Sequence, residues 1–166
     1  MIEPTISMVG TQQVEQALKQ LAKRLEGQTR VLVGVPEGAG SYEDGLTIAT
    51  IAAVNNFGSA DGRIPAREFL QPAINEGAPQ YQRLAEIMIP KVLSGSMTMT
   101  TLLEQMGNLA EGHVKQKITD GPFVENAEST KRAKGSDKPL QGKTGNLRQS
   151  IRYVIDESTE PLEEGL

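Results

Sequence analysis

One stretch, Ile48 to Ala73, most constrains what this 166-residue chain can fold into. Residues 46–57 are rich in Ala and Ile, and we expect them to form a helix that is buried on most sides. Gly58 stands where a residue of positive φ would end that helix. A polar loop follows, and Phe69 and Leu70 then return the chain to the core. Composition therefore predicts two packed segments with an exposed loop between them.

Hydrophobic periodicity predicts helices and strands on both sides of this stretch. Apolar residues three and four positions apart predict helices over residues 12–24, 79–90 and 99–118. Pro90 should end or kink the second of these helices, and a capping box from Thr101 to Glu104 should mark the third. Alternating or β-branched runs predict strands over residues 5–9, 30–36 and 147–155. These elements predict an α+β fold, in which a small, mainly antiparallel sheet of three to four strands packs on three to four helices with long loops.

The rest of the chain divides into one domain and a short tail. We expect a single domain over residues 1–156, with a long loop at 120–146 that has no apolar period. Residues 157–166 are acidic, and we expect them to be a flexible tail. The apolar fraction of 37% and the six aromatic residues predict a modest core whose loops need a partner.

The basic residues gather in one part of the chain. Residues 129–152 carry a single acid, Asp137, against seven basic residues: Lys131, Arg132, Lys134, Lys138, Lys143, Arg148 and Arg152. Five acids and no base then occupy residues 156–166. This asymmetry favours charge-complementary contacts within or between subunits. The basic segment has three possible interpretations: a loop that faces solvent, a contact to an acidic protein surface, or a contact to DNA phosphates.

Catalytic and metal-binding patterns are weak in this sequence. The chain has no cysteine, and its one histidine, His113, has no second ligand of the same kind. Gly142-Lys143-Thr144 suggests a phosphate-binding loop, but Asp137 stands where that pattern requires glycine. We therefore expect no enzyme, cofactor or metal site. No apolar run is long enough to span a membrane, and the first ten residues do not predict a signal peptide.

Two separated motifs carry a resemblance to a known family. The first reads IAAVNNFG over residues 51–58, then IPAREFL over 64–70, with Pro72-Ala73 behind it. The second reads KPL over residues 138–140, then TGNLR over 144–148 and Ser150-Ile151. In this order they resemble the head–tail joining, or tail-completion, proteins of tailed bacteriophages.

The chain departs from that family pattern at four places. Asn56 stands where the family usually has an acid, and Glu68 stands where it has proline. Residues 141–143 replace a shorter acidic link. Phe123 is the nearest aromatic to the position of the usual tryptophan after the last long helix.

The resemblance implies a structural virion protein with no chemistry of its own. It would be made in the cytoplasm of the bacterial host and form a homo-oligomeric ring, expected to be a hexamer, in the neck. Its partners would be the head connector or adaptor and the tail tube or tail terminator, with DNA near the lumen and no membrane. A tail terminator, or another minor tail or baseplate component, is an alternative reading. A nucleic-acid-binding module that uses residues 131–152 is a second alternative.

The same reasoning selects candidate site residues. Loops 37–45, 59–63 and 123–143 would reach neighbouring subunits. The candidate partner contacts are Ser59, Asp61, Arg63, Arg67, Lys131, Arg132, Lys134, Lys138, Lys143 and Arg148. The candidate structural anchors are Phe57, Gly58, Pro65, Phe69, Leu70, Gly145, Leu147 and Ile151. Of these, Phe57 and Phe69 should hold the loop at 59–63 between them.

Overall fold

The computed structural model describes residues 16, 19, 29–42, 45–142 and 144–157. Within these residues lie five helices and two strands, so the fold is α+β as predicted. In chain order they are β1 (Arg30–Gly34), α2 (Ile48–Phe57), α3 (Leu70–Leu93), α4 (Met99–Asp120), α5 (Glu128–Lys134), α6 (Asn146–Ser150) and β2 (Arg152–Asp156). Most of the predicted strand 5–9 and helix 12–24 lies outside the described residues.

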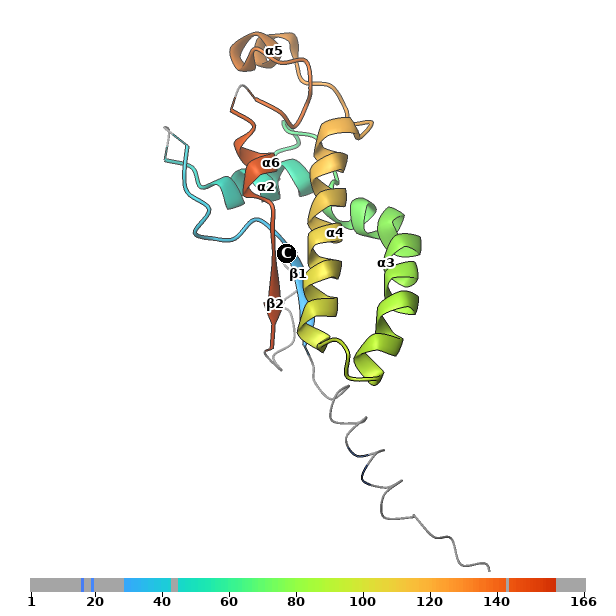
Figure 1. Ribbon diagram of the computed structural model, residues 1–166. Helices are drawn as coiled ribbons and strands as arrows, with labels where there is room; N and C mark the ends of the chain where they lie inside the picture. Colours follow the sequence, from blue (N-terminus) through green and yellow to red (C-terminus); the bar gives the residue numbers. More distant parts are fainter. Residues whose placement is uncertain (1–15, 17–18, 20–28, 43–44, 143, 158–166) are drawn as a thin grey trace, which may run out of the picture.

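Helix α4 lies at the centre of the packing and contacts α3, both strands and α6. Helix α3 lies antiparallel beside it, and the β1–β2 sheet packs on another side (Figure 1). Helices α2 and α6 contact each other near the C-terminal end of α4, and α5 stands apart beyond that end. Among the described helices, none is long and apolar enough to cross a membrane.

The buried face of α4 explains this arrangement. Leu102, Ala110, Val114 and Ile118 are buried along one stripe, at the spacing that brings residues to one side of a helix. Val114 and Ile118 belong to the main core cluster with Phe69, Leu147 and other residues, while Leu102 packs with Met88 and Val92 of α3. The helix predicted over 99–118 is therefore confirmed.

The N-terminus of α4 differs from the prediction. Thr98 is its N-cap, because the Thr98 hydroxyl accepts a hydrogen bond of 3.1 Å from the backbone N–H of Thr101. The predicted capping box at Thr101 and Glu104 is therefore wrong, since both residues lie inside the helix. Thr98 lies three residues before Thr101, and it is Thr98 that caps the helix.

The sheet joins two distant parts of the chain. Strand β1 pairs with β2 in antiparallel register, from Arg30 opposite Asp156 to Gly34 opposite Arg152. An ion pair of 2.8 Å between Arg30 Nε and Asp156 Oδ2 closes one end. Two strands are present in the described residues, so the predicted sheet of three to four strands is not reached there.

The predicted strand over 147–155 is wrong in its first half. Residues 146–150 form the short helix α6, and only the following residues pair with β1. Gly145 precedes α6 with a φ of 62°, a backbone conformation that favours glycine. Leu147 and Ile151 are both buried, and a spacing of four places two residues on one face of either a helix or a strand. The apolar pattern was therefore ambiguous at this point.

Helix α3 is longer than its sequence suggested. The sequence predicts a helix from residue 79 with a stop or kink at Pro90, but the helix begins at Leu70, continues through Pro79 and ends at Leu93. Its buried residues Ala73, Gly77, Met88 and Val92 span both prolines. Packing against α4 along the whole length therefore outweighs the local preference of proline for helix ends.

The predicted loop at 120–146 contains a helix. Helix α5 has no buried residue, so it shows no apolar period from which it could be predicted. Gly135 ends it with a φ of 61°. The expected long loop is therefore wrong over residues 128–134.

Two glycines of α4 give a matched test of its packing. A Cβ added at Gly107 would overlap the ring of Tyr153, whereas one at Gly112 would meet nothing within 4 Å. Overpacking costs about 1–3 kcal/mol, while alanine is favoured over glycine in a helix by about 1 kcal/mol. We expect Gly112→Ala to raise the unfolding free energy and Gly107→Ala to lower it, measured by urea denaturation. Adding Tyr153→Ala should reverse the sign at Gly107, and a stabilising Gly107→Ala single variant would contradict this packing.

Candidate interaction groove

Asn56 connects α2 to the start of α3. Its side chain is buried, and its Oδ1 accepts hydrogen bonds from the backbone N–H groups of Phe69 (3.0 Å) and Leu70 (3.2 Å). No side chain at Phe69, the N-cap position of α3, provides such an acceptor. Asn56 therefore caps α3 from another helix. An acid, which the resembled family has at this position, would also offer an oxygen to these donors.

We expect Asn56→Ala to lower the unfolding free energy by about 1–3 kcal/mol, because two donors would lose their acceptor in a buried place. Asn56→Asp should cost less, because a carboxylate keeps the oxygen and is favoured at a helix N-terminus. Asn55→Ala is the control, since among the described residues the Asn55 side chain bonds only the carbonyl of Ile51 in its own helix. Equal losses for the Asn55 and Asn56 variants in thermal unfolding would rule out the cap.

The loop after α2 is held by its own polar side chains. Gly58 has a φ of 84°, and the Ser59 hydroxyl donates to Asp61 Oδ1 (2.6 Å) and accepts from the backbone of Ile64 (2.8 Å). The bond from Ser59 lowers the pKa of Asp61 below its ordinary value. Arg63 is 87% exposed and pairs with Asp61 at 3.2 Å. The loop therefore presents Arg63 on a defined backbone.

Arg67, one of the predicted partner contacts, is buried. Only 5% of the residue is exposed, and Nε donates to the carbonyl of Val124 at 2.8 Å. Nη2 donates to the carbonyl of Glu125 (3.3 Å) and to Oδ1 of Asn126 (3.0 Å). Burial lowers the pKa of the guanidinium. Arg67 is thus an internal tie between two segments, and its role as a partner contact stays a prediction.

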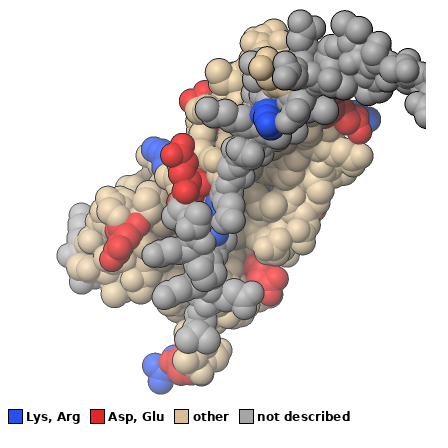
Figure 2. Space-filling view, turned by 90° about the horizontal axis from the view of Figure 1, so that it is seen from below, with Lys and Arg blue, Asp and Glu red and all other residues tan. Residues whose placement is uncertain are grey.

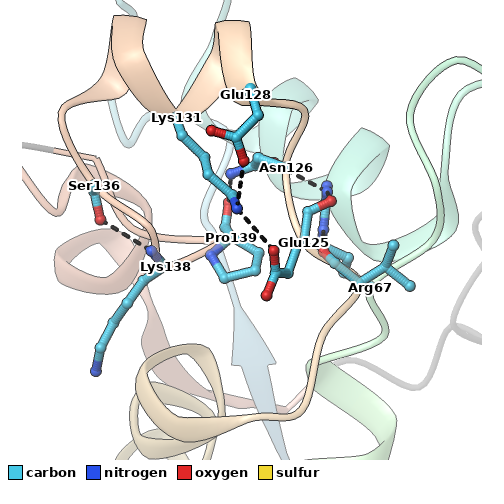
Figure 3. A network of polar contacts seen from close by, with 9 residues as sticks. Arg67, Glu125, Asn126, Glu128, Lys131, Ser136, Lys138 and Pro139 are labelled. Carbon is cyan, nitrogen blue, oxygen red and sulfur yellow. Dashed lines mark hydrogen bonds and ion pairs between the residues drawn. The ribbon is translucent and has the colours of Figure 1, made fainter.

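Lys131 is also occupied within the chain. Its Nζ lies 2.7 Å from Glu125 Oε2 and 2.9 Å from Glu128 Oε1, and the lysine side chain is only 16% exposed (Figure 3). The hydrogen bond to Glu125, followed by that to Glu128, raises the pKa of Lys131. Reversing this charge would therefore disturb the fold of residues 125–131 before it affected any partner.

Three of the other basic candidates also form hydrogen bonds within the chain, and a fourth is exposed. Lys138 and Arg148 both reach Thr119, at its carbonyl (3.1 Å) and its hydroxyl (3.1 Å), and so fasten the C-terminal part to the end of α4. Lys134 Nζ donates to the carbonyl of Pro139 at 2.6 Å. Arg132 is exposed, with a long contact of 3.4 Å to the carbonyl of Glu128. Lys143 and the acidic residues after Glu157 lie outside the described residues.

The predicted anchors are partly right. Phe69, Leu147 and Ile151 are buried to 4% exposure or less, and Leu70 packs against the same cluster. Phe57 is 63% exposed, so it does not anchor the loop. Because successive helical residues point about 100° apart, Asn56 takes the inward position and Phe57 points to solvent. Pro65 is exposed as well, so the loop is anchored at Asn56 and Arg67 instead.

A groove of about 580 Å³ lies where the two motif-bearing stretches meet. Ile51, Ile64, Pro65 and Arg67 line it from the first motif, and Leu140 and Asn146 line it from the second. Lys134 adds a side chain from α5. Its walls are therefore apolar with a few cationic and amide groups. Glu125, the one acid among the described lining residues, is already paired with Lys131. Such a lining suits the binding of an extended segment.

A second hollow, of about 280 Å³, lies beside His113 between α3 and α4. His113 Nδ1 is 2.8 Å from the Tyr81 hydroxyl, and Nε2 is 3.1 Å from Oε1 of Gln80. Burial raises the pKa of Tyr81. Hydrogen bonds at both ring nitrogens of His113 thus connect α4 to α3. No group of three His, Cys, Asp or Glu residues that could hold a metal ion is found in the part of the chain that the structure describes.

These features were not all accessible from sequence. The motifs indicated Gly58, Phe69, Leu147 and Ile151, but neither the cap by Asn56 nor the direction of Arg67 had a sequence signal beyond the resemblance itself. Comparison of the chain with models of protein families, with curated proteins and with solved structures finds no match.

Proposed function

We propose that this chain is a structural subunit of a tailed-bacteriophage virion, located in the neck, where copies form a ring that joins the head connector to the tail. The mechanism is interface complementarity without a chemical step. The support is the resemblance of two motifs, together with how they lie in the fold.

The observation that carries the proposal is the meeting of those motifs. Phe69 from the first motif and Leu147 and Ile151 from the second are buried in one core cluster with α4 between them in sequence. The same two stretches line the groove. Two motifs that depend on each other in the fold are less easily explained by chance similarity than two that lie apart.

The small sheet bears on the finer fold prediction. A two-stranded sheet needs a helix or a further strand to be stable, and this one packs on α4. We propose that the finer prediction, a sheet of three to four strands, is completed by residues 5–9 or by a strand from a neighbouring copy. Val154 of β2 is 53% exposed on a face of the sheet, which offers apolar surface to a neighbouring copy.

Native mass spectrometry of the full chain tests the ring, and immunogold labelling of purified phage particles tests its place. We expect a hexamer in solution and gold at the junction of head and tail. A protein that stays monomeric and is absent from the particles would contradict the proposal. Label at the far end of the tail would favour a baseplate component.

The nucleic-acid reading is less well supported. Lys131, Lys138 and Arg148 are engaged within the chain, and on the face drawn in Figure 2 the described basic and acidic residues are interspersed. A gel-shift assay at physiological salt separates the readings. Tight DNA binding without ring formation would favour the nucleic-acid module.

A further inference from the structure

The groove holds two cations that have only neutral partners among the described residues. Arg67 donates to two carbonyls and an amide oxygen, and Lys134 donates to the carbonyl of Pro139. Asn126 links the two sites, because its Oδ1 accepts from Arg67 and its Nδ2 donates to that same carbonyl at 3.1 Å. Arg67 and Lys134 are therefore held on either side of one asparagine (Figure 3 shows Arg67 and Asn126).

Donor capacity remains on both cations. Arg67 uses Nε and Nη2, and no hydrogen bond from its Nη1 is present within the described residues. In that part of the chain no buried side-chain nitrogen lacks a partner, so Nη1 keeps some contact with solvent. Lys134 has two further N–H groups beyond the one given to Pro139.

The electrostatics favour an anion at this place. The pKa of Lys134 is lowered, first by burial and then by repulsion from Arg67. Glu125 does not relieve this repulsion fully, because its Oε2 is bonded to Lys131. Arg63 adds a further positive charge at the rim, although Asp61 offsets it in part. A carboxylate between Arg67 and Lys134 would make charge-assisted hydrogen bonds to both.

We propose that this groove binds the acidic segment 157–166 of a second copy of the chain, with a carboxylate between Arg67 Nη1 and Lys134 Nζ. The inference rests on the proposed function, because the groove of one copy must lie within reach of the acidic segment of another. The segment ESTEPLEEGL carries four glutamates and no basic residue. Its Pro161-Leu162 pair matches the apolar lining from Ile64, Pro65 and Leu140.

Strand β2 carries the chain away from its own groove before the acidic segment begins, which favours the groove of another copy. Strand β2 starts next to α6, which borders the groove, and runs away from it to Asp156 (Figure 1). Glu157, where the acidic segment begins, therefore lies at the end of the sheet that is remote from its own groove. Ten residues span at most about 35 Å when extended, which is enough to reach a neighbour.

The test uses a fluorescent peptide of residues 157–166 and the full chain, followed by fluorescence anisotropy at physiological salt. We expect Lys134→Gln to weaken peptide binding about tenfold or more, and Lys134→Arg to restore most of it. Arg83→Gln, which removes an exposed cation on α3, is the matched control and should change nothing. A peptide with its four glutamates replaced by glutamine should not bind. Circular dichroism checks that each variant is folded.

The second arm replaces the four glutamates by glutamine in the full chain and measures self-association by sedimentation. We expect weaker association and unchanged or tighter binding of the wild-type peptide. Equal peptide binding to wild type and Lys134→Gln would overturn the inference, as would displacement of the peptide by single-stranded DNA. So would a monomeric wild type that binds the peptide only after its own glutamates are removed, because the segment would then fill its own groove.

Rings that persist in the glutamine variant would overturn the groove assignment and leave the proposed function intact. Peptide binding that depends on Lys134, in a chain that forms no ring, would support the groove assignment and contradict the proposed function.

Discussion

Phe69→Ala is expected to lower the free energy of unfolding by about 3–5 kcal/mol, the usual range for deleting a buried aromatic ring. Phe69 is fully buried, at 0% exposure, and belongs to the cluster that includes Val114 and Ile118 of α4 and Ile151 before β2. Its backbone N–H also carries one of the hydrogen bonds to Asn56. The ring therefore lies where three separate parts of the chain meet, and its removal leaves a cavity that none of them fills alone.

Urea denaturation followed by circular dichroism measures this loss. Phe57→Ala is the matched control, because it deletes the same ring from the same stretch at a position that is 63% exposed. Exposed substitutions usually change stability by less than about 0.5 kcal/mol. Similar losses for the two variants would mean that the core is not centred on Phe69.

Arg67→Met is expected to lower the free energy of unfolding by about 3 kcal/mol, because hydrogen bonds from a charged donor are worth about 1.5–3 kcal/mol each and only part of that loss is recovered by water. The substitution leaves two carbonyls and the amide oxygen of Asn126 without their donor. Arg67→Lys should recover only a part. An ammonium group cannot reproduce the planar fork of the guanidinium.

Hydrogen exchange gives a local measurement beside global unfolding. The backbone amide of Lys131, which donates to the carbonyl of Ala127 at 3.0 Å, should exchange faster in Arg67→Met than in wild type, because the segment before it loses its tie to the loop after α2. Arg63→Met removes a guanidinium that is 87% exposed, and it should leave both the stability and the exchange unchanged. Loss of stability in the Arg63 variant alone would show that the tie has been assigned to the wrong arginine.

The sequence predicted those elements whose burial follows a single period. The strand at 30–34 and the helix at 99–120 each have an apolar pattern that fits one geometry, and both formed within a few residues of expectation. Helix α5 buries nothing, so hydrophobic periodicity could not detect it. Its Glu128–Lys131 ion pair at i and i+3 was a usable signal, but a weak one without a neighbouring apolar residue.

The candidate groove was predictable only in part. Apolar residues of the motifs, such as Phe69 and Leu147, indicated what would be buried. The fate of Arg67 could not be read from sequence, because two of its three acceptors are backbone carbonyls, which every residue possesses. Those carbonyls lie 57 and 58 residues away. Which distant carbonyls an arginine meets is decided by the packing of α4 between them.

The pairing of β1 with β2 has a consequence for how the chain folds as it is made. Arg30 and Asp156 are 126 residues apart, and α2 to α6 are synthesised between them. At about 5–20 residues per second, β1 waits roughly ten seconds on the ribosome before β2 exists. The α3–α4 hairpin depends on contacts close in sequence and can form during that interval. A nascent chain stopped before residue 152 would thus carry its helical hairpin without the sheet, so the sheet of each subunit forms only after residues 152–156 have been made.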